Sequence, residues 1–97
     1  MKESRPMIVD FGAEWCPACK ELEKQTFPDE KVRTAAGNFV GVHIDCTDED
    51  VLAVAQKKYG VKGLPTVLLI NSKGEEKKRF TKFLEPGEFV EELQGID

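Results

Sequence analysis

The stretch MIVDFGAEWCPACK, residues 7–20, runs from an apolar segment directly into two cysteines that are three positions apart. Its first five residues are apolar except for Asp10, and a glycine ends the run, so they predict a buried strand. Pro17 fits the first turn of a helix, where its missing N–H group is not needed for a hydrogen bond. The sequence therefore places a Cys-x-x-Cys pair, Cys16 and Cys19, where a strand gives way to a helix.

The rest of the chain alternates between strand and helix patterns. We expect strands over residues 7–11, 39–45, 66–70 and 77–83, and helices over 17–26, 30–36, from 47–50 to Gly60, and from Pro86 to near Gly95. This order, β-α-β-α-β-β-α, predicts an α/β fold with a central mixed sheet flanked by helices. The first two strands should be parallel, in a sheet ordered second-first-third-fourth with the second strand at an edge. The whole chain, 1–97, fits one domain.

The predicted junction suits the two cysteines to redox chemistry. Free amide N–H groups of the first helical turn can point at the Cys16 sulfur, and the helix dipole adds positive charge there. Both favour the thiolate, which is the nucleophile in disulfide exchange. An exposed, activated Cys16 followed by Cys19 one turn deeper suits attack followed by resolution. The alternative, two small cysteines that only pack, fits the neighbouring Trp15 and Pro17 less well.

Composition argues against several classes of partner. The chain has 14 Lys and Arg against 18 Asp and Glu, a formal charge of −4, which disfavours nucleic acid or an anionic membrane as a main partner. The longest aliphatic run, residues 67–70, is far too short to span a bilayer. Three cysteines are too few for a disulfide scaffold.

Two separated segments resemble the thioredoxin family. VDFGAEWCPACK, residues 9–20, resembles the family's active-site segment, and VKGLPTVLLI, residues 61–70, resembles the segment that carries its cis-proline. The wider stretch AEWCPACKELEKQTFPDEKV, residues 13–32, is similar to the C-terminal, thioredoxin-like domain of the DsbD family of membrane electron transporters. There, too, Lys-Glu follows the Cys-x-x-Cys motif, with an acid seven residues after the first cysteine and then a Thr-Phe pair. The resemblance covers roughly residues 6–94 and implies a thioredoxin-like fold and thiol–disulfide exchange.

The chain departs from the thioredoxin pattern in two places. Thioredoxin has Gly-Pro between its cysteines, whereas this chain has Pro17-Ala18. Since the intervening pair tunes the redox potential, the family's potential does not carry over. Only six residues precede Met7, so we expect the usual N-terminal strand and helix of the fold to be absent. The chain is then either a trimmed domain or a minimal version of the fold.

The resemblance also implies which residues meet the substrate. Trp15 matches the tryptophan beside the family's active site, and Pro65 matches the cis-proline whose loop lies opposite the cysteines. A cis bond there would expose the backbone of Leu64, and an extended substrate segment can pair with such a backbone like an added strand. We therefore expect the substrate-binding residues to be Trp15, Pro17, Leu64 and Pro65.

Two acids are further candidates for the catalytic site. Asp10 is the one acid in a strand that should be apolar throughout if both of its faces are covered. Its carboxyl should have a raised pKa and could accept the Cys19 proton. Glu23 lies seven residues after Cys16, on the same helical face, and is either part of the site or an ordinary solvated side chain.

His43 and Cys46 raise a rival hypothesis. Together with Cys16 and Cys19 they supply the ligand types of a Cys3His zinc site. However, His43 lies in a strand pattern and Cys46 just beyond its end, not on a zinc knuckle. In the redox interpretation Cys46 is a small, partly buried free thiol and His43 is an exposed or satisfied strand residue. A third interpretation is a thioredoxin-fold adaptor that binds partners without turnover, which the intact Cys-x-x-Cys pair disfavours.

The sequence therefore predicts a thiol–disulfide oxidoreductase that acts as a reductant of protein disulfides. We expect no bound cofactor and no metal. The expected partners are protein disulfides and an upstream thiol donor, either a thioredoxin reductase or a membrane electron carrier, without nucleic acid binding or membrane insertion. We expect a monomer, with dimerisation through the open edge strand as the alternative. The compartment would be the periplasm for an excised DsbD-like domain, and otherwise the cytoplasm.

Overall fold

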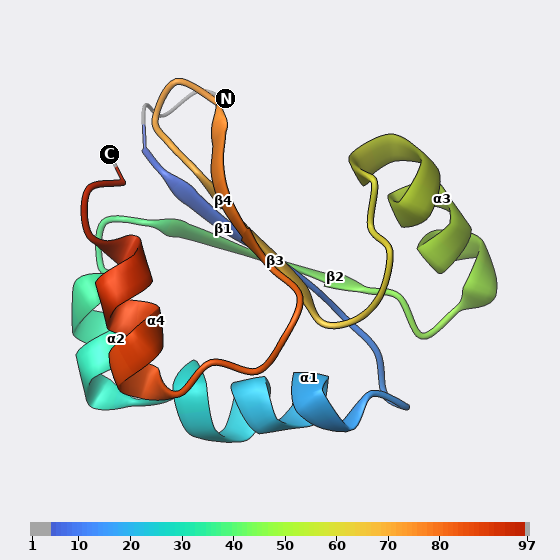
Figure 1. Ribbon diagram of the computed structural model, residues 1–97, viewed down its shortest axis with the longest axis horizontal. Helices are drawn as coiled ribbons and strands as arrows, with labels where there is room; N and C mark the ends of the chain where they lie inside the picture. The colour runs from blue at the N-terminus through green and yellow to red at the C-terminus, as the bar shows by residue number, and fades with distance from the viewer. Residues whose placement is uncertain (1–4, 97) are drawn as a thin grey trace.

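A four-stranded sheet forms the centre of the computed structural model, which describes residues 5–96 (Figure 1). Helix α3 lies on one face of the sheet, and helices α1, α2 and α4 lie on the other. The elements are β1 (Met7–Gly12), α1 (Pro17–Glu21), η1 (Leu22–Thr26), α2 (Glu30–Ala35), β2 (Val40–Asp45), α3 (Glu49–Tyr59), β3 (Thr66–Ile70), β4 (Glu76–Phe80) and α4 (Pro86–Leu93). Within residues 5–96, no helix is both long and apolar enough to cross a bilayer.

The strand order β2-β1-β3-β4 confirms the predicted topology. Strand β1 pairs in parallel with β2 and antiparallel with β3, and β3 pairs antiparallel with β4. In the described part of the chain β2 is therefore an edge strand. Its side chains alternate between half-buried and exposed, with Val40, Val42 and Ile44 on the inner side, as their spacing predicts.

The two faces of the sheet bury separate apolar clusters, because neighbouring residues of a strand point in opposite directions. In β1, Val9 and Phe11 pack toward α3 together with Leu68 of β3. Leu69 of β3 packs on the other face, against the cluster that includes the helical residues Leu22, Val32, Phe89 and Leu93. Asp10 lies between Val9 and Phe11 in β1, so its side chain points to the face covered by α1 and η1.

Two elements differ from the sequence prediction. The helix predicted over 17–26 forms, but its second half, η1, is a π-helix in which the Phe27 N–H donates to the Leu22 carbonyl at 2.9 Å. The buried Thr26 at its end donates its hydroxyl to the Leu84 carbonyl at 2.6 Å. Strand β4 ends at Phe80 and not at residue 83, and beyond it the chain leaves the sheet and buries Leu84 in the cluster beneath the helices.

Candidate active site

Cys16 and Cys19 form a disulfide at the start of α1, where the sequence predicted a redox pair. Cys16 is the N-cap of the helix and Pro17 occupies its first turn, because a proline there loses no helical hydrogen bond. The backbone N–H of Cys19 points at the Cys16 sulfur, with 3.2 Å between the two atoms. This amide is one of the free donors of a helix N-terminus, and it is placed to stabilise a thiolate on Cys16.

Both cysteines are buried, which corrects the expectation that Cys16 is exposed. The exposed fraction is 5% for Cys16 and 3% for Cys19. The two pack with Ala13, and Leu64 from the loop before β3 lies against this small cluster. The packing of neighbouring loops therefore limits access to Cys16. The local sequence showed only that Cys16 begins a helix and could not show these contacts.

The loop before β3 contains a cis peptide bond between Leu64 and Pro65, as the resemblance predicted. Pro65 is fully buried, while Leu64 is half-buried and packs against the cysteine cluster. The loop and the start of α1 therefore lie side by side, although Cys19 and Leu64 are 45 positions apart in the chain, since 64 minus 19 is 45.

Trp15 is the most exposed large apolar residue of the site, with 58% of its surface exposed. The loop around it is tied to the segment after β2: the Glu14 N–H donates to the Thr47 hydroxyl at 2.9 Å, and the Trp15 indole N–H donates to the Thr47 carbonyl at 3.5 Å. Thr47 in turn donates its hydroxyl to the Asp45 carboxylate at 2.6 Å, and the hydrogen bonds from Thr47 lower the pKa of Asp45. These contacts hold an exposed aromatic ring beside the disulfide.

Asp10 is buried beneath the helix that carries the cysteines, with an exposed fraction of 8%. Its carboxyl oxygen Oδ2 lies 2.8 Å from Nδ1 of His43, the residue opposite it in the parallel register of β1 and β2. Burial raises the pKa of Asp10 above its ordinary value; the hydrogen bond and charge of His43 counteract this rise, and the Glu23 carboxylate adds to it. The raised pKa that the sequence predicted for this acid is thus confirmed.

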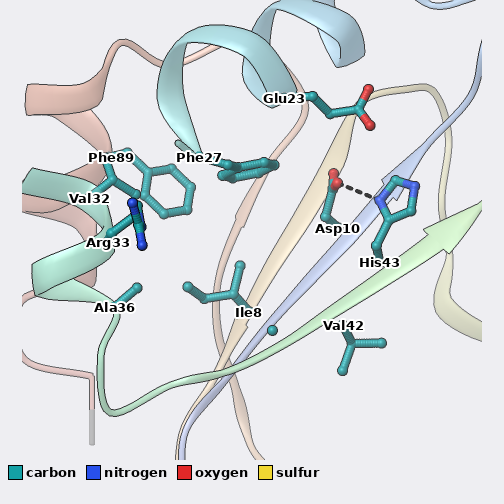
Figure 2. A pocket seen from close by; sticks show the side chains of 11 residues that line it. Ile8, Asp10, Glu23, Phe27, Val32, Arg33, Ala36, Val42, His43 and Phe89 are labelled. Atoms are coloured by element: carbon teal, nitrogen blue, oxygen red, sulfur yellow. Dashed lines mark hydrogen bonds and ion pairs between the residues drawn. The ribbon is translucent and has the colours of Figure 1, made fainter. Parts of the chain in front are cut away.

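Glu23 faces the same region as Asp10. Both line a hollow of about 500 Å³ between the helices and the edge of the sheet, and Figure 2 shows the Glu23 carboxylate above the Asp10–His43 pair. Lys20, one turn earlier, forms ion pairs with Glu14 at 2.9 Å and with Glu23 at 3.6 Å. Glu23 is therefore partly exposed but electrostatically coupled to the buried acid, and this coupling distinguishes it from an isolated surface residue.

A family profile described as a thioredoxin-like domain matches residues 1–96. The chain belongs to this thioredoxin-like domain family. It is 39% identical over 96 residues to the thiol:disulfide interchange protein DsbD of Yersinia pestis (strain Pestoides F), a match that covers 96% of this chain and 16% of that relative. This thioredoxin-like chain thus spans about one sixth of the length of the curated relatives that it matches.

Solved structures agree with this assignment. The oxidised C-terminal domain of DsbD from Neisseria meningitidis superposes with a TM-score of 0.77 at 28% identity, covering 96% of this chain and 81% of that one. A thioredoxin from Thermus thermophilus gives a TM-score of 0.77 at 26% identity, covering 93% of this chain and 72% of that one. The predicted thioredoxin-like fold is confirmed, and the predicted Cys-x-x-Cys pair forms a disulfide.

The Cys3His zinc hypothesis is not supported. Cys46 is completely buried on the α3 side of the sheet, packed with Val9 and Phe11, whereas His43 contacts Asp10 on the opposite face. Among residues 5–96, no three Cys, His, Asp or Glu side chains converge in a way that could hold a metal ion. Because strand neighbours point in alternate directions, the spacing that suggested the site also separates its members. Cys46 is the free thiol of the chain.

Two contributors to the site were not recognised in the sequence. Thr47 braces the Trp15 loop, whereas the sequence pattern of residues 47–50 marked it only as the start of a helix, whose N-cap is in fact Asp48. His43 was interpreted as an ordinary strand residue or a zinc ligand, yet its register with Asp10 follows from pairing the two predicted parallel strands. A register argument from the paired strands could have found it, because each residue of a parallel pair has one nearest neighbour across the ladder.

Proposed function

We propose that this chain reduces protein disulfides, with Cys16 as the attacking thiol and Cys19 as the resolving thiol. The observation that carries the proposal is the disulfide at the start of α1, with the Cys19 amide pointing at the Cys16 sulfur. A helix N-terminus favours a thiolate on its N-cap residue, and the thiolate is the species that attacks a disulfide. Residues 1–97 are proposed to act as one domain.

In the first step the Cys16 thiolate attacks one sulfur of the substrate disulfide. A bond forms between Cys16 and the substrate, and the other substrate sulfur leaves as a thiolate that takes a proton from solvent. The helix start supports this step, since the Cys19 N–H that points at the Cys16 sulfur in the disulfide is placed to donate to a Cys16 thiolate as well.

In the second step Cys19 resolves the mixed disulfide. The Cys19 thiol gives its proton to the Asp10 carboxylate, and its sulfur attacks the Cys16 sulfur. The bond between Cys16 and the substrate breaks, the substrate leaves as a thiolate, and the Cys16–Cys19 disulfide forms. Two electrons have then passed from the protein to the substrate. Glu23 modulates this step through its charge beside Asp10.

The substrate is proposed to dock on the exposed ring of Trp15 and along the loop opposite it. Trp15 offers a large apolar surface at the site, and Leu64 is half-buried against the cysteines. An extended segment that pairs with the backbone at Leu64 and Pro65 would bring its disulfide over Cys16. Pro17 completes the surface between the cysteines.

Regeneration requires an upstream thiol donor, which by family resemblance is a thioredoxin reductase or a membrane electron carrier. The direction of flow is tested by equilibrating the Cys16–Cys19 pair with glutathione buffers. A potential more negative than that of the glutathione pool supports the reductant, and a potential near −120 mV, the value of a strong thiol oxidant, contradicts it.

The roles of the cysteines are tested by insulin reduction with single variants. Cys16→Ser should abolish the activity, because no thiolate is left at the helix N-cap. Cys19→Ser should retain attack but accumulate mixed disulfides, detectable by mass. Cys46→Ser is the matched control, since that thiol is buried on the other face of the sheet and should leave the rate unchanged. Full activity without Cys16 would contradict the proposal.

A further inference from the structure

His43 contacts the Asp10 carboxyl but takes no part in the two exchange steps proposed above. Its Nδ1 atom lies 2.8 Å from Asp10 Oδ2, and its side chain is half exposed at the edge of the sheet (Figure 2). The pair joins β1 to β2 and is set by strand register, and its members are 33 positions apart in the chain. One end of the imidazole thus meets a buried carboxyl and the other end faces solvent.

Few groups other than His43 stabilise the ionised form of the Asp10 carboxyl. Among residues 5–96, His43 is the side chain that hydrogen-bonds to it, and Oδ1 accepts no hydrogen bond from a described residue. Burial makes the carboxylate form of Asp10 costly, and the negative charge of Glu23 makes it costlier. The hydrogen bond from His43 acts in the opposite direction, since it stabilises the charged carboxylate.

The pair also lies next to the resolving cysteine. A side-chain carbon placed on Gly12 would lie 3.6 Å from the Cys19 sulfur and 3.6 Å from Cε1 of His43, so these two atoms are at most twice that distance apart. Gly12 follows Phe11 in β1, two residues after Asp10 on the same face of the strand. The Cys19 thiol and the Asp10–His43 pair therefore lie close together over the same face of β1, beneath α1.

We propose that His43 is a positioning residue for the second step of the exchange: its imidazole holds the Asp10 carboxyl ionised and oriented so that the free oxygen, Oδ1, takes the Cys19 proton. The inference rests on the proposed function, because it assigns a role within the resolution of the mixed disulfide. The proton moves from the Cys19 sulfur to Asp10 Oδ1, and the sulfur then attacks Cys16 as already described. His43 keeps its contact with Oδ2 throughout and reacts with no sulfur.

Other charges face this pair and belong to the same equilibrium. The groups are Glu23 of η1, Lys20 of α1, Glu14 of the preceding loop, Asp45 of β2 and Arg33 of α2. Since the groups are coupled, the measured midpoints belong to the cluster as a whole, and the test compares variants.

The test follows the reduced protein as it reacts with dithiobis(nitrobenzoate), a disulfide whose thiolate is coloured. Cys16 attack releases one equivalent of colour and Cys19 resolution releases a second, so the two steps appear as two phases. All variants carry Cys46→Ser so that two thiols react. His43→Ala should slow the second phase about tenfold at neutral pH and shift its pH midpoint upward, with rates converging at high pH. Tenfold corresponds to about 1.4 kcal/mol, close to the lower end of the range for one hydrogen bond to a charged group.

Two further variants separate positioning from simple structural support. His43→Gln retains an N–H donor and should recover part of the rate. In an Asp10→Asn background, His43→Ala should have no additional effect, because the residue acts through that carboxyl. Lys57→Ala is the control: it removes a positive charge from α3, on the other face of the sheet, and should leave the midpoint unchanged.

The outcomes distinguish this inference from the function on which it rests. If two equivalents are released and His43→Ala leaves the midpoint of the second phase unchanged, the role of His43 is overturned while the redox function stands. An equal slowing by His43→Ala with and without Asp10 would also overturn it. If wild-type protein releases no second equivalent, the proposed function itself fails and the role of His43 fails with it.

Discussion

Reduction of the Cys16–Cys19 disulfide is expected to destabilise the folded protein. The bond closes a loop of four residues, since the cysteines are three positions apart. For such a loop the chain-entropy expression gives about 6 cal/mol/K, or about 2 kcal/mol at 25 °C, by which the bond restricts the unfolded chain. The folded protein already holds the two cysteines together at the start of α1, so it loses little of this entropy.

An opposing effect favours the reduced form. The helix N-terminus stabilises a thiolate on Cys16, through the Cys19 amide and the helix dipole, by about 0.3–1 kcal/mol. The entropic contribution is larger, so the oxidised protein should be more stable by about 1–2 kcal/mol. By linkage, the folded pair should then be more reducing than the same pair in the unfolded chain by about 20–40 mV. This sign agrees with a reductant.

The assay is urea unfolding of the oxidised protein and of the protein reduced with dithiothreitol. For a chain of this size the difference corresponds to a shift of about 1 M in the urea midpoint. A Cys16→Ala/Cys19→Ala double variant is the control and should unfold at the same midpoint with and without the reductant. If reduced wild-type protein is instead the more stable form, thiolate stabilisation outweighs loop entropy, and the pair has the thermodynamics of an oxidant.

Three further predictions concern the acids and the core. Because burial raises the pKa of Asp10, the wild-type protein should lose free energy of unfolding as pH rises through that pKa. Asp10→Asn should therefore be more stable than wild type at pH 8 but not at pH 3, as measured by urea unfolding. Asp10→Asn and Glu23→Gln should each lower the pH midpoint of Cys16 alkylation, because each removes a negative charge that disfavours the thiolate, and the double variant should lower it further. Unchanged midpoints in both single variants would mean that the acids are screened from the thiol. Phe89→Ala should lower the free energy of unfolding by about 3–5 kcal/mol by opening a cavity among the core aromatics, whereas Val54→Ala, at a residue 57% exposed, should change it by less than about 0.5 kcal/mol.

Local sequence predicted most of the fold because the decisive patterns are short-range. Strand β3 forms over the residues predicted, since an apolar run bounded by Pro65 and Asn71 leaves little freedom in its ends. The helix start at Pro17 was equally well marked by its proline. The π-helical turn before Phe27 was not predictable in this way, because its last residue is held by a hydrogen bond from Thr26 to Leu84, 58 positions away.

For the site, the sequence by itself determined the chemistry of the cysteine pair: two thiols at a helix start, with an acid in the preceding strand. Tertiary structure alone decided how that pair is surrounded. Leu64 and Ala13 bury the Cys16 sulfur, and strand register sets His43 against Asp10. Register and loop packing depend on contacts between distant segments, and a one-residue shift of β2 would turn His43 to the opposite face of the sheet. The residue type determines the chemistry that Asp10 can perform, whereas the register of β1 and β2 determines that His43 is its partner.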